Sequence, residues 1–460
     1  MKKITLLFAI FLSVVSVFGQ CPAVDIYLTT QADVDNFAST YPNCTQLTHL
    51  LRIDGDTAII DNLNGLSEII DAQDIFILKT QIIDFTGLDN LVNVRNLTLW
   101  FNDNVQNLDG FSSLQEIASL EMFTNNSLIN LSGLTDIQFI HGINLFENDN
   151  LTDLSHLSFI TSINSFVLGG NSISTLAGLE NLQEVTGNFF VSNELLENFN
   201  ALESLQSIDG SLYLMNNNYV LDVSAFNNIS SLVNLYVVEC PNLQNISGFQ
   251  NLQTVDEVFR IGFNTELRNL VDFTNIISVG NLDIYENENL ISLRGLGNLE
   301  IIHQRLFINN NPQLIAIQPL RNVDPTQIEE VVILNNINLS ICRNDLICAI
   351  IEDDSVEKTI ALNAPGCNTV EEVLNMCLTN PTDIILNNQL RVYPNPVVET
   401  LTILPSENIS YFKAIIYSIF GEKLIETSEK DIDFSNLSKG IYFVEIATNK
   451  GTISKKIVKK

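Results

Sequence analysis

A short motif recurs every 22 to 24 residues along most of this 460-residue chain. It reads Leu-x-Gly-Leu at residues 63–66, 131–134 and 176–179, and its third position can be followed through twelve units. Glycine fills seven of the twelve positions, and the next residue is always Leu or Phe. A fixed period of this length is typical of solenoids, in which each repeat packs against its neighbours. The twelve positions are Gly65, Gly87, Gly110, Gly133, His156, Gly178, Ala201, Ala225, Gly248, Asp272, Gly295 and Pro319.

Each unit also contains a short stretch in which apolar and variable residues alternate, as in Leu97–Leu99, Leu212–Leu214 and Leu306–Ile308. Such alternation predicts a strand with one buried face, and a strand of three to five residues cannot bury that face alone. We therefore predict an all-β fold: a right-handed parallel β-solenoid of about 12–13 coils over residues 51–340, between caps at 20–50 and 341–378.

An Asn-rich turn follows each predicted strand, and the chain holds 57 Asn. An Asn amide has both a donor and an acceptor, so it can pair backbone groups of its own coil and of the next. One turn position holds Asn125, Asn148, Asn264 and Asn287 in four of the units, and Cys240 in another. We therefore predict that Cys240 is a buried free thiol; the alternative, a catalytic cysteine, would need a nearby His.

These units resemble the receptor L-domain family, a leucine-rich-repeat-like solenoid known from growth-factor and insulin receptor ectodomains, and look closest to its secreted bacterial versions. The segments Leu28–Asp35 and Tyr41–Cys44 add to the resemblance, which covers residues 21–378. It implies a solenoid of the leucine-rich-repeat type. The receptor modules are shorter than this unbroken run of coils, so their ligand contacts are not carried over.

The first 19 residues have the features of a secretory signal peptide. Two lysines precede an apolar run, Ile4–Phe18, that is shorter than the ~20 residues a membrane-spanning helix needs, and Gly19 is a small residue suited to cleavage. Cys21 raises the alternative of a lipoprotein, but Gln20 stands where that signal needs a small residue. With no later segment long and apolar enough to cross a bilayer, we expect an exported protein without a transmembrane segment.

Six cysteines stand at the two ends of the predicted solenoid: Cys21 and Cys44 at the start, and Cys342, Cys348, Cys367 and Cys377 at the end. In an oxidising compartment we expect them to form disulfides in the caps. A zinc site in the late cluster is the weaker alternative, because the spacings lack paired C-x-x-C knuckles. Four cysteines allow three pairings, and the sequence does not choose among them.

The composition changes near residue 388. Residues 388–460 carry 10 basic and 8 acidic residues, a net charge of +2, whereas residues 20–387 carry 10 basic and 46 acidic residues, a net charge of −36. Residues 379–389 have the composition of a linker. Short β-type runs at 397–404, 412–420, 440–448 and 451–458 predict a small antiparallel β-sandwich over 390–460, with a hairpin turn at Asn449–Gly451.

This tail is similar to the C-terminal sorting domain of the type IX secretion system. The resemblance depends on four motifs that occur in the family's order: Val392–Pro396, which includes Tyr393, Pro394, Asn395 and Pro396; Gly421–Lys423; Leu437–Phe443, which includes Gly440; and a basic end that includes Lys455 and Lys456. It implies that the type IX machinery exports the chain across the outer membrane, and that the protein is then released or attached to the surface. The alternative is an ordinary β-sandwich with a basic end.

The sequence contains few patterns that would support catalysis. The four histidines, His49, His141, His156 and His303, form no metalloprotease motif, and there is no nucleophile elbow or phosphate-binding loop. We therefore expect no catalytic residue, metal or cofactor. One enzyme alternative remains, a parallel β-helix that degrades polysaccharides, because a glycosidase needs only two carboxylates placed in space. The one Asp-Asp pair, Asp353–Asp354, falls in the cysteine-rich cap.

Charge narrows the choice of partner. A net charge of −32 disfavours nucleic acid and anionic lipid, since both carry phosphate. Acidic turns such as Glu147–Asp149 and Glu286–Glu288 could bind calcium, but they lack the oxygen spacing of a calcium loop, so we expect solvated charge.

Aromatic residues stand at outward positions of the predicted strands. If Leu97 and Leu99 point inward, Trp100 points outward, and Phe123 and Phe146 take the same place in the next two coils. Phe190, Tyr213 and Tyr236 stand in the neighbouring outward row, with Tyr285 and Phe307 further along. A contiguous aromatic face rimmed by acidic residues would suit a protein partner or the faces of sugar rings. Alternatively, the rings stack on one another and only stabilise the sheet.

Taken together, the sequence predicts a secreted or surface-attached binding or adhesion protein without catalytic activity. We expect it to recognise a protein or glycan through the aromatic strand face.

Overall fold

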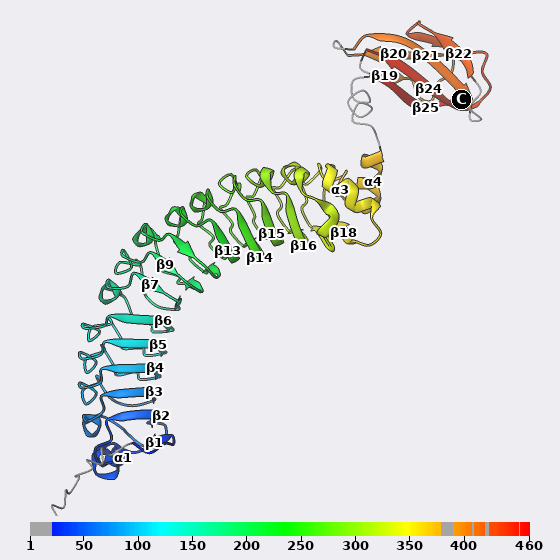
Figure 1. The fold of residues 1–460 in the computed structure, drawn as a ribbon. Coiled ribbons are helices and arrows are strands. Elements are labelled where there is room, and N and C mark those ends of the chain that lie inside the picture. The colour runs from blue at the N-terminus through cyan, green and yellow to red at the C-terminus, as the bar shows by residue number, and fades with distance from the viewer. Residues whose placement is uncertain (1–20, 379–389, 407–408, 419–422, 450) are drawn as a thin grey trace, which may run out of the picture. The chain divides into compact units, whose positions relative to one another are not determined.

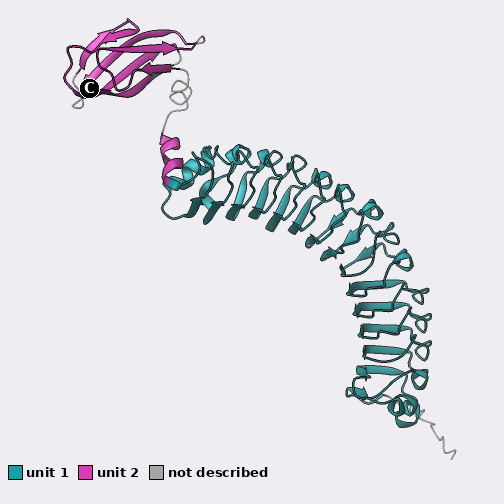
Figure 2. Cartoon of the chain, turned by 180° about the vertical axis from the view of Figure 1, so that it is seen from behind, with its two compact units in different colours: residues 1–370 teal, residues 371–460 magenta. Residues whose placement is uncertain are grey.

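The computed structural model describes residues 21–378, 390–406, 409–418, 423–449 and 451–460. The predicted signal peptide at 1–19 and the predicted linker at 379–389 lie outside the described residues, as do Gly421 and Glu422 of one sorting motif and Lys450 of the predicted hairpin turn. The chain forms two compact units, residues 1–370 and residues 371–460, which are coloured separately in Figure 2.

One parallel sheet of 15 strands forms the first unit, with the strands of successive coils side by side (Figure 1). Their order in the sheet follows their order in the chain, which is the arrangement expected of a β-solenoid. The strands are β1 (Ile26–Leu28), β2 (Gln46–Asp54), β3 (Asp71–Leu78), β4 (Asn93–Trp100), β5 (Glu116–Phe123), β6 (Phe139–Phe146), β8 (Ser165–Gly169), β10 (Phe189–Ser192), β12 (Leu212–Met215), β13 (Ser231–Val238), β14 (Thr254–Gly262), β15 (Ser278–Tyr285), β16 (Ile301–Asn309), β17 (Glu330–Leu334) and β18 (Glu357–Ala361).

Many of these strands are longer than the three to five residues predicted. β4 and β5 have eight residues each. The segment that precedes the alternating residues in β4 also pairs with the matching segment of β5, as Asn93 does with Glu116. In the middle coils that segment forms a separate parallel sheet of three very short strands: β7 (Ser162–Ile163), β9 (Glu184–Val185) and β11 (Ser207–Ile208). The path of the stack turns between β6 and β13 (Figure 1).

Short helices complete the coils and the caps. The 3₁₀ helices are η1 (Asn64–Leu66), η2 (Ser155–Leu157), η3 (Asn200–Leu202), η4 (Ser224–Phe226), η5 (Ser247–Phe249), η6 (Leu296–Asn298), η7 (Gln318–Asn322) and η8 (Pro325–Gln327). The α-helices are α1 (Gln31–Asp35) and α2 (Phe37–Thr40) near the start, and α3 (Asp345–Glu352) and α4 (Val370–Leu378) near the cysteine-rich end.

The core of the solenoid is a continuous column of inward side chains. Leu97 and Leu99 are fully buried, as the alternation predicts. Large residues that follow the motif's third position also stack through the interior: Phe249 lies 6.1 Å from Phe226 and 5.4 Å from Phe273, ring centroid to ring centroid, with the rings nearly parallel. Burying one such side chain contributes about 1.5–3 kcal/mol, and each coil depends on its neighbours for that burial.

Where the turn has positive φ at the motif's third position, it needs glycine there because two coils touch. A Cβ atom on Gly295 would lie 1.7 Å from the backbone oxygen of Leu270 in the previous coil, and one on Gly133 would lie 2.0 Å from that of Leu108. Both glycines also have positive φ, 116° and 104°, which other residues rarely adopt. Where His156, Ala201 or Ala225 takes this position, the turn is a 3₁₀ helix without positive φ.

Replacing Gly295 tests this packing against a control two residues away. Gly295→Ala should lower the free energy of unfolding by about 2 kcal/mol or more, because the methyl group meets backbone and the φ is strained. Gly297→Ala should change stability little, since nothing lies within 4 Å of its Cβ position. Urea midpoints of the two variants measure the difference; equal midpoints would refute the packing argument.

A ladder of buried Asn side chains joins successive coils where the strands end. The backbone N–H of Asn125 donates to Oδ1 of Asn148 at 3.0 Å, and Nδ2 of Asn148 donates to the backbone oxygen of Met122 in the previous coil, also at 3.0 Å. These bonds are the ones expected from the Asn-rich turns, and a satisfied buried hydrogen bond contributes about 1 kcal/mol net. The ladder residues are Asn102, Asn125, Asn148, Asn171, Asn193, Asn217, Asn264, Asn287, Asn311, Asn336 and Asn363, all buried.

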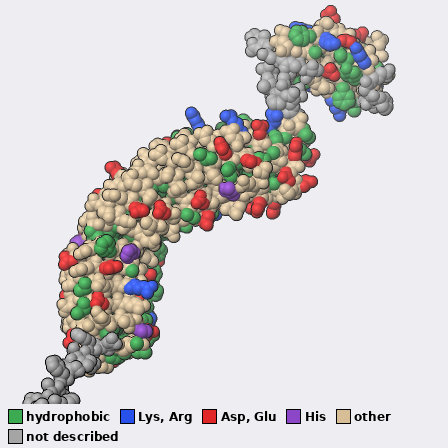
Figure 3. All heavy atoms as spheres, in the orientation of Figure 1, with side chains coloured by type: hydrophobic (Ala, Val, Ile, Leu, Met, Phe, Trp, Pro, Cys, Tyr) green, Lys and Arg blue, Asp and Glu red, His purple; other side chains and the backbone are tan. Residues whose placement is uncertain are grey.

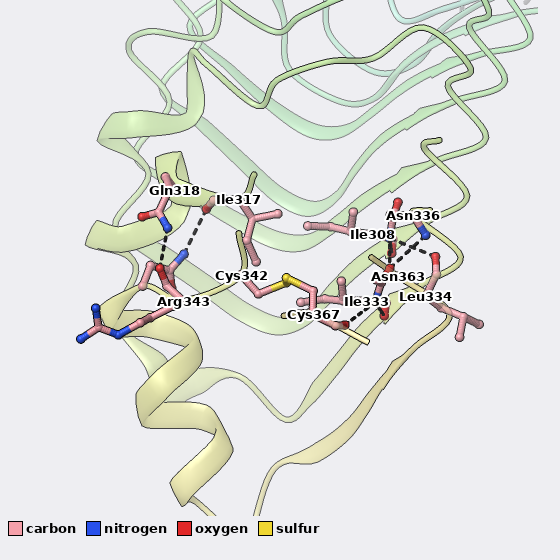
Figure 4. Close-up of a disulfide and its surroundings, with 11 residues drawn as sticks. Ile308, Ile317, Gln318, Ile333, Leu334, Asn336, Cys342, Arg343, Asn363 and Cys367 are labelled. Atoms are coloured by element: carbon pink, nitrogen blue, oxygen red, sulfur yellow. Dashed lines mark hydrogen bonds between the residues drawn. A yellow bond between two sulfur atoms is a disulfide. The ribbon is translucent and has the colours of Figure 1, made fainter. Parts of the chain in front are cut away.

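Disulfides hold both ends of the solenoid. Cys21 pairs with Cys44 and Cys342 pairs with Cys367, and Cys348 and Cys377 are also disulfide-bonded. At the second end the ladder reaches the disulfide itself, because Nδ2 of Asn363 donates to the backbone oxygen of Cys367 at 3.0 Å (Figure 4). At each end of the solenoid, where no further coil covers the core, a disulfide-linked cap covers it instead.

Cys240 is free and buried, in the ladder position that the sequence indicates. Its backbone N–H donates to Oδ1 of Asn264 at 3.0 Å, as an Asn at this position would do. Burial raises the pKa of the Cys240 thiol to about 12, so it is protonated at neutral pH and a poor nucleophile.

Thiol counting tests this assignment. The native protein should react with no equivalent of a thiol reagent at neutral pH, and the protein denatured without reductant should react with one. Two or more thiols after denaturation, or none, would contradict the account of Cys240.

Two antiparallel sheets form the second unit around a separate apolar core, as the predicted sandwich requires. One contains β19 (Leu390–Tyr393), β20 (Thr400–Pro405) and β23 (Asp431–Asp433); the other contains β22 (Lys423–Thr427), β21 (Tyr411–Ser418), β24 (Gly440–Thr448) and β25 (Gly451–Lys459). The sequence analysis did not identify β19, β22 or β23, which are three to five residues long.

Candidate functional site

The outward side chains of the sheet form two adjacent rows that cross the coils. The first, here the Tyr213 row, contains the residues that the sheet places in register with Tyr213. They are Tyr27, Arg52, Phe76, Thr98, Glu121, Asn144, Val167, Phe190, Tyr213, Tyr236, Arg260, Asp283, Phe307, Val332 and Thr359. The second, the Trp100 row, lies two residues further along each strand and includes Leu78, Trp100, Phe123, Phe146, Gly169, Ser192, Met215, Val238, Gly262, Tyr285 and Asn309. Tyr285 and Phe307 thus belong to different rows.

The first aromatic cluster lies over β3–β6. Phe123 packs edge-on against Trp100, with ring centroids 6.2 Å apart, and stacks nearly parallel to Phe146 at 6.0 Å. The ring of Phe146 covers Gly169 in the next coil, where a Cβ atom would lie 2.5 Å from the ring. Phe76 and Phe101 extend the cluster through contacts with Trp100 and Phe123.

The second cluster lies over β10–β13. Ring centroids are 6.0 Å apart between Phe190 and Tyr213, and 5.0 Å apart between Tyr213 and Tyr236. The guanidinium of Arg260 continues the row 4.9 Å from the centre of the Tyr236 ring. All three rings are half-buried, so each keeps part of its surface in contact with solvent.

An ionic bridge connects the second cluster to a third. The buried carboxylate of Asp283 accepts hydrogen bonds from Arg260 at 2.7 Å and from Arg305 at 2.8 Å. Burial opposes the charge of Arg260, but the bonds to Asp283 outweigh it and raise the pKa of that guanidinium. Arg305 also lies 5.1 Å from the centre of the Phe307 ring, which contacts Tyr285 at 6.1 Å.

The eight aromatic residues singled out from the sequence therefore all lie on the outward face, but not as one contiguous surface. Among the described residues, ring contacts divide them into three clusters, because Val167 and Gly169 interrupt both rows at β8 and Arg260 and Asp283 interrupt the Tyr213 row. The sequence analysis missed the Arg260–Asp283–Arg305 bridge and three further rings. These are Phe76, Phe101 and Phe263, of which Phe263 packs edge-on against Tyr285 of the third cluster, with ring centroids 5.4 Å apart. Aligning the turns on the Asn ladder could have found Phe101 and Phe263, which both stand one residue before a ladder Asn.

Removing the Asp283 carboxylate should destabilise this face. Asp283→Asn would leave two cations facing a buried amide, and we expect a loss of about 2–4 kcal/mol in the free energy of unfolding. Asp56→Asn removes a carboxylate from an exposed pair with Lys79 and should cost less than about 1 kcal/mol. Urea denaturation of both variants measures these losses. If Asp283→Asn lowers the free energy of unfolding no more than Asp56→Asn does, the bridge does not stabilise this face.

Acidic side chains dominate the solenoid surface. On the face drawn in Figure 3 they are spread along the coils and exceed the basic ones. The turn residues Glu147, Asp149 and Glu288 are exposed on this surface, and Glu286 is half-buried. Among the described residues, no three His, Cys, Asp or Glu side chains lie together in a way that could hold a metal ion.

Three of the residues weighed for catalysis, Asp353, His303 and His141, make contacts within turns or on the surface. Asp353 follows α3, where its Oδ1 accepts from the backbone N–H and the hydroxyl of Ser355, and these bonds lower its pKa. His303 is exposed and bonds to Gln327, and His141 is exposed beside Glu116. Each of these contacts is a local turn or surface interaction.

The sorting motifs, distant in the sequence, meet in the second unit. The side-chain amide of Asn395 makes two hydrogen bonds to β25. Its Nδ2 donates to the backbone oxygen of Lys456, and its Oδ1 accepts from the backbone N–H of Val458, each at 2.9 Å. Gly440 pairs with Lys459 at the start of β24. Lys456 is exposed, whereas Lys455 is half-buried and burial lowers its pKa.

Residues 391–460 match the protein family described as the secretion system C-terminal sorting domain. The match confirms the resemblance seen in the tail, and it identifies an exported protein that the type IX secretion system delivers to the outer cell surface or the outside of the cell. No curated protein matches the chain. Among the described residues, no helix has the length and apolar character needed to cross a membrane.

Proposed function

We propose that the exported solenoid is a non-catalytic binding or adhesion protein that recognises a protein or glycan through its outward strand face. We also propose that the solenoid is of the receptor L-domain type. The repeat period, the Asn ladder and the disulfide caps support that second proposal.

The observation that carries the binding proposal is the pair of outward rows with half-buried rings. Large aromatic side chains held in place by their neighbours lose little conformational entropy on binding, which is why Tyr and Trp are common anchors of interfaces. Tyr213 and Tyr236 contact each other, and Tyr236 also contacts Arg260, while both tyrosines stay partly exposed. Stacking among the rings stabilises the sheet as well, and the two roles are compatible.

Removing the rings of the second cluster tests the proposal. The double variant Tyr213→Ala/Tyr236→Ala should lose retention on a glycan and surface-protein array by at least about tenfold while keeping its fold by circular dichroism. Tyr213→Phe/Tyr236→Phe keeps the rings and should retain most binding. Tyr219→Ala, on an exposed turn, serves as the control for a lost surface tyrosine.

Unchanged retention by the alanine double variant would refute the assignment of this face. Any polysaccharide that binds should also be analysed for cleavage products, which tests whether the protein is an enzyme. Shortened or unsaturated sugars would show that the protein is a polysaccharide-degrading enzyme.

A further inference from the structure

Basic residues are few in the solenoid and gather in its last coils. Residues 20–387 carry 10 basic and 46 acidic residues, and six of the ten basic ones lie between positions 260 and 343. Two of the six, Arg260 and Arg305, are held by the buried carboxylate of Asp283. The other four lie between the strands, and none of them forms an ion pair in the part of the chain that the structure describes: Arg268, Arg294, Arg321 and Arg343. Pairing with the acidic surface therefore does not explain these four cations.

A groove of about 600 Å³ brings two of these arginines together. Its lining comes from three successive coils and is called the Arg294 groove below. It includes Thr274, Arg294, Gly297, Asn298, Arg321 and Asn322. Both arginines are exposed, and none of the lining residues is acidic, although acids greatly outnumber bases in the solenoid. The groove is therefore a local cationic surface on an acidic protein.

The groove lies where Gly297 lacks a side chain. Thr274, Gly297 and Arg321 take the same place in the three coils, each one residue after the buried Phe or Leu of the motif. A Cβ atom on Gly297 would have nothing within 4 Å, and Gly297 is not among the residues with positive φ. Unlike Gly295 two residues earlier, Gly297 is thus required neither by packing nor by backbone geometry. Its missing side chain leaves the row open between Thr274 and Arg321.

Hydrogen bonds tie the three coils together at the groove. Nδ2 of Asn298 donates to the backbone oxygen of Thr274, and Nδ2 of Asn322 donates to the backbone oxygen of Gly297, each at 2.7 Å. A lining that is already ordered in this way loses little conformational entropy when a ligand binds.

The acids that follow the lining segments in the sequence do not line the groove. These acids are Asp272, Glu300 and Asp324. Asp272 accepts a hydrogen bond from the side chain of Gln250 at 3.2 Å, and Asp324 accepts one from the backbone N–H of Thr326 at 2.9 Å. The two arginines of the groove therefore keep their donors for a ligand.

We propose that the Arg294 groove binds the phosphate group of a phosphorylated sugar. A guanidinium has paired N–H donors that match phosphate oxygens, and Arg294 and Arg321 reach the groove from adjacent coils, so both can donate to one phosphate. The groove is much larger than a phosphate ion, and the hydroxyl of Thr274 and the amides in its lining suit the hydroxyl groups of a sugar. The lining residues lie outside the strands, so this site is separate from the strand face and goes beyond the proposed function.

Titration calorimetry of the full chain tests the site with three probes: glucose 6-phosphate, glucose and inorganic phosphate. A buffer free of phosphate and sulfate with about 0.15 M NaCl screens charges more than ~8 Å apart, which weakens repulsion by the acidic surface and preserves contacts inside the groove. Glucose 6-phosphate should bind with a millimolar or lower Kd. Glucose and inorganic phosphate should each bind at least about tenfold more weakly, because each lacks half of the contacts.

Three variants separate the groove from the general charge of the surface. Arg294→Gln/Arg321→Gln should weaken the binding of glucose 6-phosphate at least about tenfold. Arg268→Gln removes an exposed arginine of the preceding coil that does not line the groove, and it should keep the binding. Gly297→Gln fills the open row and should weaken the binding, while its urea midpoint stays near that of the unchanged protein.

Equal binding of glucose 6-phosphate and glucose, no binding of either, or binding that survives in the double arginine variant would overturn the proposal. So would inorganic phosphate that binds as tightly as glucose 6-phosphate, because the groove would then recognise the ion alone. A loss in Arg268→Gln as large as that in the double variant would also overturn it. None of these results bears on the strand face, which Tyr213→Ala/Tyr236→Ala tests separately.

Discussion

The close contact between successive coils is the constraint on which the rest of this structure depends. Strands in a sheet lie about 4.8 Å apart, so every part of a coil must fit within that spacing. At the motif's third position the glycine-containing turns leave no room for a side chain, and Gly133 and Gly295 meet the backbone of the previous coil. Where the strands end, backbone groups would be buried unpaired, and Asn side chains such as Asn148 supply both the acceptor and the donor. Period, glycine content and Asn content thus have one physical origin.

The same stacking determines what the outer face can present. Residues at equivalent strand positions are brought into rows, so a ring in one coil is held by the ring or cation in the next, as Tyr236 is by Tyr213 and Arg260. A regular stack gives a nearly continuous surface. Among the described coils from Lys79 to Leu362, the one that contains β10 alone has no positive-φ residue between its outward strand residue, Ser192, and its ladder residue, Asn193, so the stack is irregular there. The irregular turn therefore lies beside the coils that carry the proposed recognition surface, Phe190, Tyr213 and Tyr236.

Features that depend on the repeat could be predicted from the sequence: the parallel stack, the inward leucines, the Asn ladder, and the free thiol of Cys240, which takes a ladder position. Each follows from local alternation or from a position that recurs in many units. The rest depends on single coils. The Asp283 bridge joins residues of three successive coils, and nothing in the local pattern marks Arg260 or Arg305 as its partners. The irregular turn at Ser192 also belongs to a single coil, and in the sequence it corresponds only to a 22-residue interval between Asn171 and Asn193.

Photocrosslinking in the producing cells tests the central claim, recognition through the strand face, most directly. A benzophenone amino acid would replace Tyr236 in one variant and the exposed turn residue Tyr219 in another, and the covalent adducts on the exported protein would be compared by mass. The account predicts one discrete adduct from position 236, on protein or glycan, and none from position 219. An adduct from position 219 alone, or equal unspecific labelling from both, would contradict it.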